Sequence, residues 1–205
     1  APGVRYSASG KPALIIPAAL GMHNWHPMAY SPVTGLVYIP ITISNAAYGM
    51  QKNFKYNPAG WNTGMDFSSG ADLYKAPGAP PRGNVTSYIL AWDPVNSKEV
   101  FRIPNAEYGA SGLLATDGNL IFSGNHMGEF VAYSATTGQK LWSAPTGARV
   151  VAAPATYEVD GKQQLAILVG ARGLPPKQER TSAVSANNSR ILVFAAGGTA
   201  KLPTA

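Results

Sequence analysis

One segment of the sequence, ATDGNLIFSGNHMGEFVAYSATTGQKLW at residues 115–142, limits the possible folds more than any other. Short apolar runs alternate in it with turns that contain Gly, Asn and Asp, which is typical of strands joined by tight turns. Glycine and asparagine tolerate the positive backbone angles that such hairpin turns require. No run is long enough for an ordinary helix. With the LLAT that overlaps its start, the segment predicts four strands of one antiparallel sheet, and its last aromatic, Trp142, is expected to pack against a neighbouring sheet.

The same pattern recurs on both sides of this segment. Ala91 precedes Phe101 by the same spacing as Ala132 precedes Trp142, and the two copies lie 41 residues apart (132 − 91). A spacing of ~40–45 residues is typical of four-stranded propeller blades. A third copy contains VVAAPATYEV, a DG turn, KQQLAILVGA and SRILVFAA. The sequence therefore predicts an all-β chain with about three four-stranded antiparallel blades, at residues 25–102, 112–143 and 150–196.

A long insertion interrupts the first of these blades, from about residue 42 to residue 84. Loops of this length in compact domains are usually functional or disordered. The aromatic residues Phe54, Tyr56, Trp61 and Phe67 lie within it. They favour an ordered insertion that packs against another part of the protein.

The composition narrows the function classes. The chain has no cysteine, which excludes disulfides, thiolate metal sites and a CxxCH haem attachment within these 205 residues. No apolar stretch approaches the ~18 residues of a transmembrane helix. The net charge of +6 is spread along the chain without a run of like charges, which disfavours nucleic acid as a partner.

Five blocks of the sequence, taken in order, resemble the pyrroloquinoline-quinone (PQQ) alcohol dehydrogenases of the methanol/ethanol type, especially their quinohaemoprotein branch. The blocks are GMHNWHPMAYSPVTGLVYIPI, NFKYNPAGWNTGMDF, ILAWDPVNSKEVFRIP, LLATDGNLIFSGNHMGEFVAYSATTGQKLW and VVAAPATYEVDGKQQLAILVGA. The resemblance implies an eight-bladed propeller with PQQ near its axis, and residues 1–205 as its C-terminal part. Closed propellers have ~4–8 blades, so a missing segment or another chain is expected to complete the ring.

The resemblance also implies which functional groups this chain lacks. The calcium ligands, the catalytic Asp base, the adjacent-cysteine disulfide and a cofactor-contacting Arg or Lys are expected upstream, so no catalytic residue is assigned here and this chain alone is expected to be inactive. No metal ligand is expected here either. His23 and His26 are three residues apart, which puts them on opposite faces of an extended strand. His126, in a turn, is expected to be solvated.

Asn24 and Trp25 match the family's Asn-Trp-(Gln/His)-Pro block, which implies contact with PQQ. An amide donates to a quinone carbonyl, and an indole provides both a donor and an aromatic wall. The alternative is that Asn24 caps a turn and Trp25 fills a seam between blades.

Three further positions follow from the resemblance. Val151 is expected to contact the cofactor and Val150 to line the substrate pocket, although both also suit plain strand core. Arg149 stands where the family commonly has Gly, and it either changes the charge near the pocket or points outward. Tyr108 replaces a family Trp and is expected to line the substrate pocket, which leaves small primary and bulkier secondary alcohols both open.

The resemblance thus implies a PQQ- and calcium-dependent dehydrogenase that oxidises an alcohol to an aldehyde or ketone and passes electrons to a cytochrome c. Haem c is expected on a separate domain or protein, and the location is expected to be periplasmic. No GxGxxG nicotinamide fingerprint is present. The alternative is a non-catalytic periplasmic propeller scaffold, but such a scaffold needs neither the Asn-Trp block nor the aromatic insertion.

Overall fold

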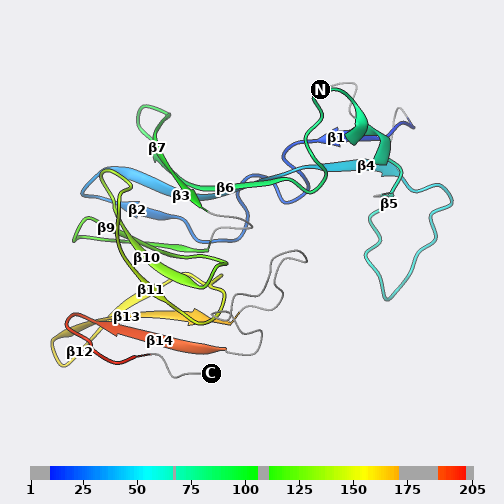
Figure 1. Ribbon diagram of the computed structural model, residues 1–205. Helices are drawn as coiled ribbons and strands as arrows, with labels where there is room; N and C mark the ends of the chain where they lie inside the picture. Colours follow the sequence, from blue (N-terminus) through cyan, green and yellow to red (C-terminus); the bar gives the residue numbers. More distant parts are fainter. Residues whose placement is uncertain (1–9, 67, 106–110, 171–188, 202–205) are drawn as a thin grey trace. The chain divides into compact units, whose positions relative to one another are not determined.

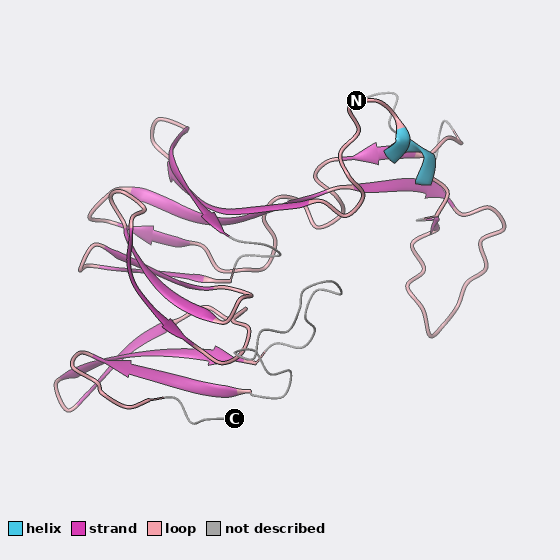
Figure 2. Ribbon diagram, in the orientation of Figure 1, coloured by secondary structure: helices cyan, strands magenta, loops and turns pink. Residues whose placement is uncertain are grey.

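The computed structural model describes residues 10–66, 68–105, 111–170 and 189–201. Its regular structure is almost entirely β, with one short 3₁₀ helix, η2 (Ala71–Lys75), in the described part (Figure 2). The chain divides into two compact units, one of Ala1–Met22 and Ile43–Thr86 and the other of His23–Thr42 and Ser87–Ala205. No helix in the described residues is long and apolar enough to cross a membrane.

The second unit is built on three sheets, and two strands of another sheet, β4 (Ala46–Met50) and β5 (Met65–Asp66), interrupt the first of them in the chain (Figure 1). The first has the order β2 (Ala29–Ser31), β3 (Leu36–Ser44), β6 (Val85–Asp93) and β7 (Lys98–Asn105). The second contains β8 (Leu113–Thr116), β9 (Leu120–Gly124), β10 (Glu129–Ser134) and β11 (Lys140–Pro145). The third contains β12 (Ala155–Val159), β13 (Lys162–Val169) and β14 (Arg190–Ala195). The predicted all-β architecture of antiparallel blades is confirmed, and two of the three blades have the predicted four strands; the described residues of the third supply three.

The second sheet follows its sequence pattern closely. LLAT, LIFSG and EFVAYS are β8, β9 and β10, and neighbouring strands pair antiparallel. Asn119 has φ 61° in the β8–β9 turn and Gly138 has φ 73° in the β10–β11 turn. Positive angles at these two residue types allow the chain to reverse within a few residues, which is why the strand ends were predictable.

The core lies in the seams between successive sheets. One cluster joins the first sheet to the second and contains Tyr38, Ile89, Ala91, Ile103, Leu113, Ile121 and Ala135. The other joins the second sheet to the third and contains Phe130, Ala148, Val150, Ile167, Val169 and Leu192. Each sheet therefore buries one face against the next sheet rather than against helices.

Aromatic rings fill the second seam. Phe130 is fully buried, 5.4 Å from the ring of Phe194 in the third sheet. Trp142 meets the same Phe194 edge-on, with ring centroids 5.5 Å apart and planes at 84°. Edge-to-face contacts of this kind are favourable for aromatic pairs. The expectation that Trp142 packs against a neighbouring sheet is confirmed.

The first unit has a small sheet of its own, in the order β1 (Ala13–Ile15), β4 (Ala46–Met50) and β5 (Met65–Asp66). The loop between β4 and β5 is held by amide hydrogen bonds. Asn62 Oδ1 accepts from the backbone N–H of Asn57 at 2.8 Å, and Asn62 Nδ2 donates to the carbonyls of Asn57 and Gly60.

The insertion differs from its sequence-based expectation in one respect. Phe54 is 47% exposed, Tyr56 73% and Trp61 95%, so the described residues do not bury these aromatics. Local amide contacts order the loop without them. Phe67 lies outside the described residues.

Tyr38 provides a test of the first seam. Its hydroxyl donates to the Ala135 carbonyl at 2.7 Å, from the first sheet to the second, and lies 2.8 Å from Thr34 Oγ1. Tyr38→Phe leaves that buried carbonyl unpaired, so the free energy of unfolding of the full-length protein should fall by about 1–2 kcal/mol. Tyr30→Phe, at an exposed tyrosine of the same sheet, is the control and should change it little. Equal losses in a denaturant titration would contradict this account of the seam.

Candidate functional site

Each sheet of the second unit is preceded by a short stretch that leads into its first strand. These three stretches, here called the entry segments, are residues 23–28 before β2, 111–112 before β8 and 146–154 before β12. All the described candidate residues lie on them, on the first and the third. Their arrangement therefore decides what the candidate site contains.

The entry segments meet at Gly112. Its N–H donates to the Val151 carbonyl at 3.3 Å, and the N–H of the next residue, Leu113, donates to the Pro27 carbonyl at 3.0 Å. A Cβ on Gly112 would lie 2.5 Å from Cβ of Ala153 and 2.8 Å from Cδ of Pro27. No side chain fits at that distance, so glycine is required for the three segments to touch.

A fourth element, the β9–β10 turn at residues 125–128, joins the third entry segment. The Val150 N–H donates to the Asn125 carbonyl at 3.0 Å, and the Thr146 N–H donates to the Gly128 carbonyl at 2.8 Å. Asn125 Oδ1 accepts from the Met127 N–H at 2.9 Å, which fixes the turn itself. The side chain between these bonds, His126, is thereby held against the third entry segment.

His126 and Arg149 form a hydrogen-bonded pair, with 2.6 Å between Arg149 Nη2 and His126 Nδ1. A guanidinium can only donate, so Nδ1 is the acceptor and the remaining imidazole proton is on Nε2. His126 Nε2 and Arg149 Nε are both buried, and neither has a hydrogen-bond partner among the described residues. The pair therefore carries two buried N–H donors for which this part of the chain supplies no acceptor.

Burial, then the positive charges of Arg149 and His26, lowers the pKa of His126 to about 4. The expectation that His126 is solvated is wrong. The hairpin turn is short, but its backbone bonds to the third entry segment turn the imidazole onto Arg149.

Trp25 and His26 lie on the first entry segment as a stacked pair, with ring centroids 4.1 Å apart and planes at 24°. The indole is 65% exposed, so contact with His26 leaves much of its surface accessible. Burial, with a smaller effect from His23, lowers the pKa of His26. His23 Nδ1 lies 3.0 Å from the Pro40 carbonyl and so donates to it.

The predicted site residues fall into three groups. Asn24 and Trp25 are exposed on the first entry segment, and Val151 is half-buried on the third. Val150 is fully buried in the second seam, which is the core role that its sequence also allowed. Tyr108 lies outside the described residues. Cofactor contact by Asn24, Trp25 and Val151, and substrate contact by Tyr108 and Val150, stay predictions.

Sequence reasoning missed two features of this region. Ser111 is fully buried, and its hydroxyl accepts from the Gly124 N–H at 2.8 Å, which fixes the second entry segment to the end of β9. The other is the contact between His126 and Arg149. Arg149 was singled out only as an unusual residue for its position. No group of three or more His, Cys, Asp or Glu that could hold a metal ion occurs in the described ranges.

Gly112→Ala tests whether the entry segments depend on close backbone approach. The new methyl group would overlap Ala153 and Pro27, and overpacking of this kind costs about 1–3 kcal/mol. Gly118→Ala is a matched control, because a Cβ there would meet only Thr116 Oγ1, at 3.7 Å. We expect a lower denaturation midpoint for the first variant alone. Identical midpoints would show that the segments can separate without cost.

The lowered pKa of His126 predicts a pH dependence of stability. The unfolded chain binds the proton more tightly than the folded chain, since the pKa moves from 6.5 to about 4 on folding. The contribution of this residue to stability is therefore complete above pH 6.5 and is lost as the pH falls toward 4. His126→Gln should flatten the acid limb of a plot of melting temperature against pH. An acid limb unchanged from that of the wild-type protein would contradict the burial of the imidazole.

Several known proteins are similar to this chain in sequence and in fold. The family model for the PQQ glucose/ethanol/alcohol dehydrogenase β-propeller domain matches residues 55–165. The chain is 37% identical over 202 residues to a quinohemoprotein alcohol dehydrogenase of Comamonas testosteroni, covering 94% of this chain and 27% of that protein. It is 39% identical over 207 residues to quinohemoprotein alcohol dehydrogenase ADH IIB of Pseudomonas putida, covering 99% of this chain and 29% of that protein.

A crystal structure of the Comamonas testosteroni quinohemoprotein alcohol dehydrogenase superposes with a TM-score of 0.80 at 34% identity. The superposition covers 99% of this chain and 30% of that one. The chain thus spans less than a third of the length of these relatives. Because the family model covers more than half of the 205 residues and the sheets superpose on such a propeller, the chain belongs to the PQQ β-propeller family of glucose, ethanol and alcohol dehydrogenases.

Proposed function

We propose that the full-length protein is a quinoprotein alcohol dehydrogenase that oxidises an alcohol to an aldehyde or ketone. The observation that carries this proposal is the match of nearly the whole chain to quinohemoprotein alcohol dehydrogenases. A relative from Thauera butanivorans, 38% identical over 203 residues, is a 1-butanol dehydrogenase (cytochrome c). These relatives support an alcohol substrate and leave its size open.

The residues of the first entry segment fit a flat quinone with carbonyl and carboxylate groups. Trp25 offers an accessible aromatic surface, and Asn24 is an exposed amide beside it. Indole faces pack well against flat conjugated rings, and an amide N–H suits a carbonyl oxygen. When bound, PQQ supplies the two-electron oxidation of the alcohol. In our proposal Trp25 covers the cofactor, Asn24 donates to it, and Val151 contacts it from the third entry segment.

We propose that other parts of the full-length protein, or partner proteins, supply the remaining functional groups of the enzyme. Calcium, the catalytic base and most of the cofactor contacts come from the preceding part of the propeller. Electrons pass to a cytochrome c, with haem c on a further domain or a separate protein, and the enzyme works in the periplasm. The substrate pocket includes Tyr108, whereas Val150 is fully buried in the second seam and supports its neighbour Val151.

The outer face of the third sheet supports a ring completed by further blades. Leu168 is 55% exposed, Ile191 67% and Val193 51%, whereas their chain neighbours Ile167, Val169 and Leu192 are buried in the seam. Strands that are apolar on both faces need a neighbour on each side. We propose that the remaining part of the propeller covers this face.

The proposal is tested by reconstituting the full-length protein with PQQ and calcium and following dye reduction by a series of alcohols. Trp25→Ala should weaken PQQ binding by roughly tenfold, since it removes a large aromatic contact. Trp61→Ala is the control, because its indole, on the β4–β5 loop, is 95% exposed and lies outside the entry segments. Wild-type protein without PQQ-dependent alcohol oxidation would favour the scaffold alternative. Unchanged PQQ affinity in Trp25→Ala would remove this residue from the cofactor site.

A further inference from the structure

The hydrogen bonding of His126 and Arg149 is incomplete. The bond between them uses His126 Nδ1 and Arg149 Nη2, and leaves the buried N–H groups of His126 Nε2 and Arg149 Nε without an acceptor in the described residues. A buried donor without a partner costs about 1–3 kcal/mol. Two such donors belong to one hydrogen-bonded pair, and the described residues supply an acceptor for neither.

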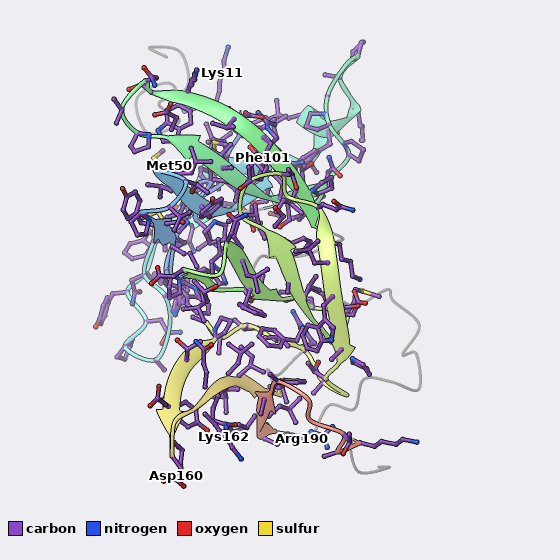
Figure 3. The ribbon with its side chains drawn as sticks, turned by 90° about the vertical axis from the view of Figure 1, so that its left-hand side faces the viewer. Lys11, Met50, Phe101, Asp160, Lys162 and Arg190 are labelled. Atoms are coloured by element: carbon purple, nitrogen blue, oxygen red, sulfur yellow. The ribbon has the colours of Figure 1, made fainter. Side chains whose placement is uncertain are left out.

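A second arginine contacts the same entry segment. His26 is close enough to His126 to lower its pKa, and Arg190 donates from Nη2 to the Thr146 carbonyl on the third entry segment at 3.2 Å. Figure 3 labels Arg190 at the start of β14. None of the ion pairs among the described residues includes Arg149 or Arg190.

The acidic residue of the neighbouring hairpin is already engaged. Glu129 accepts from Asn125 Nδ2 at 3.2 Å through one carboxylate oxygen and pairs with Lys140 Nζ at 3.2 Å through the other. It therefore does not neutralise Arg149.

We propose that Arg149 and His126 form a binding site for the carboxylate group of a small molecule. A carboxylate carries two acceptor oxygens, which match the two unpaired donors in number, and its negative charge compensates the guanidinium. The guanidinium fork is well suited to a planar carboxylate, whereas a neutral alcohol offers a single oxygen and no charge. The neighbouring Trp25 and His26 rings place this site beside the surface assigned to the cofactor.

This inference rests on the proposed function only for the origin of the carboxylate. PQQ carries three carboxylates, and a hydroxy acid substrate carries one at the end of its chain. Both have the same recognition chemistry, so the experiment must separate them. Binding of acetate to the cofactor-free protein tests the site independently of either.

The first measurement is the melting temperature of the cofactor-free, full-length protein in sodium acetate and in sodium chloride of equal ionic strength. A ligand that binds only the folded state raises the melting temperature. We expect acetate to stabilise the wild-type protein more than chloride does, and Arg149→Gln to abolish the difference. Arg149→Lys should retain part of it, because the charge remains but the fork is lost.

Lys162→Gln is the charge-matched control. Lys162 is exposed at the β12–β13 turn (Figure 3), at the opposite end of β13 from Val169, which pairs with Arg190. It should leave the acetate effect unchanged. If acetate stabilises Arg149→Gln as much as wild type, or stabilises neither, the carboxylate site is wrong. This result does not depend on whether the protein oxidises alcohols.

Two further measurements identify the source of the carboxylate. If it belongs to the cofactor, Arg149→Gln should raise the Kd for PQQ roughly tenfold or more, the usual effect of losing one charge-assisted contact. If it belongs to the substrate, the Kd for PQQ should hold, and kcat/KM for 4-hydroxybutanoate should fall roughly tenfold relative to that for 1-butanol. Absence of PQQ binding by wild-type protein would reject the proposed function, while the acetate result would still decide the site.

Discussion

Packing between successive sheets is the constraint on which this structure depends. In the described part of the chain no helix covers these sheets, so each sheet buries an apolar face against the next sheet. Large buried side chains such as Tyr38, Ile121 and Phe130 lie in the two seams formed in this way. Burying one such side chain stabilises by about 1.5–3 kcal/mol. The same need explains why the outer face of the third sheet is apolar: a sector of a ring has a neighbour on both sides.

Packing in the seams also positions the candidate site, whose polar side chains lie outside the two buried clusters. Because the sheets are held face to face, the segments that lead into their first strands must converge. Two glycines make that convergence possible. Gly112 lets three entry segments touch, and Gly124 leaves room for Val150, whose side chain would overlap a Cβ there. The fully buried Val150 then holds its neighbours Arg149 and Val151 at the site.

This arrangement buries two basic groups, which disfavours their charged forms. Burial lowers the pKa of Arg149 and, with the neighbouring positive charges, lowers that of His126. An imidazole that is neutral at pH 7 and accepts from a guanidinium presents its remaining N–H as a donor. A site of this kind is destabilising in the unliganded protein and favours an anion. Binding of an anion would therefore supply the acceptors that these buried N–H groups lack. An exposed lysine such as Lys162 has no such need, because water can hydrogen-bond to it.

The sequence by itself determined the strands, the turns and the family. Those features depend on neighbours a few residues apart, so β8, β9 and β10 follow directly from their apolar runs and turn residues. It also predicted Asn24 and Trp25 as cofactor contacts and indicated that Arg149 is unusual at its position. Only the tertiary structure brought Arg149 to His126, 23 residues away in the chain, and left Tyr56 and Trp61 of the insertion largely exposed. Such contacts depend on how whole sheets pack against one another. The spacing of residues along the chain does not indicate which loops that packing brings into contact.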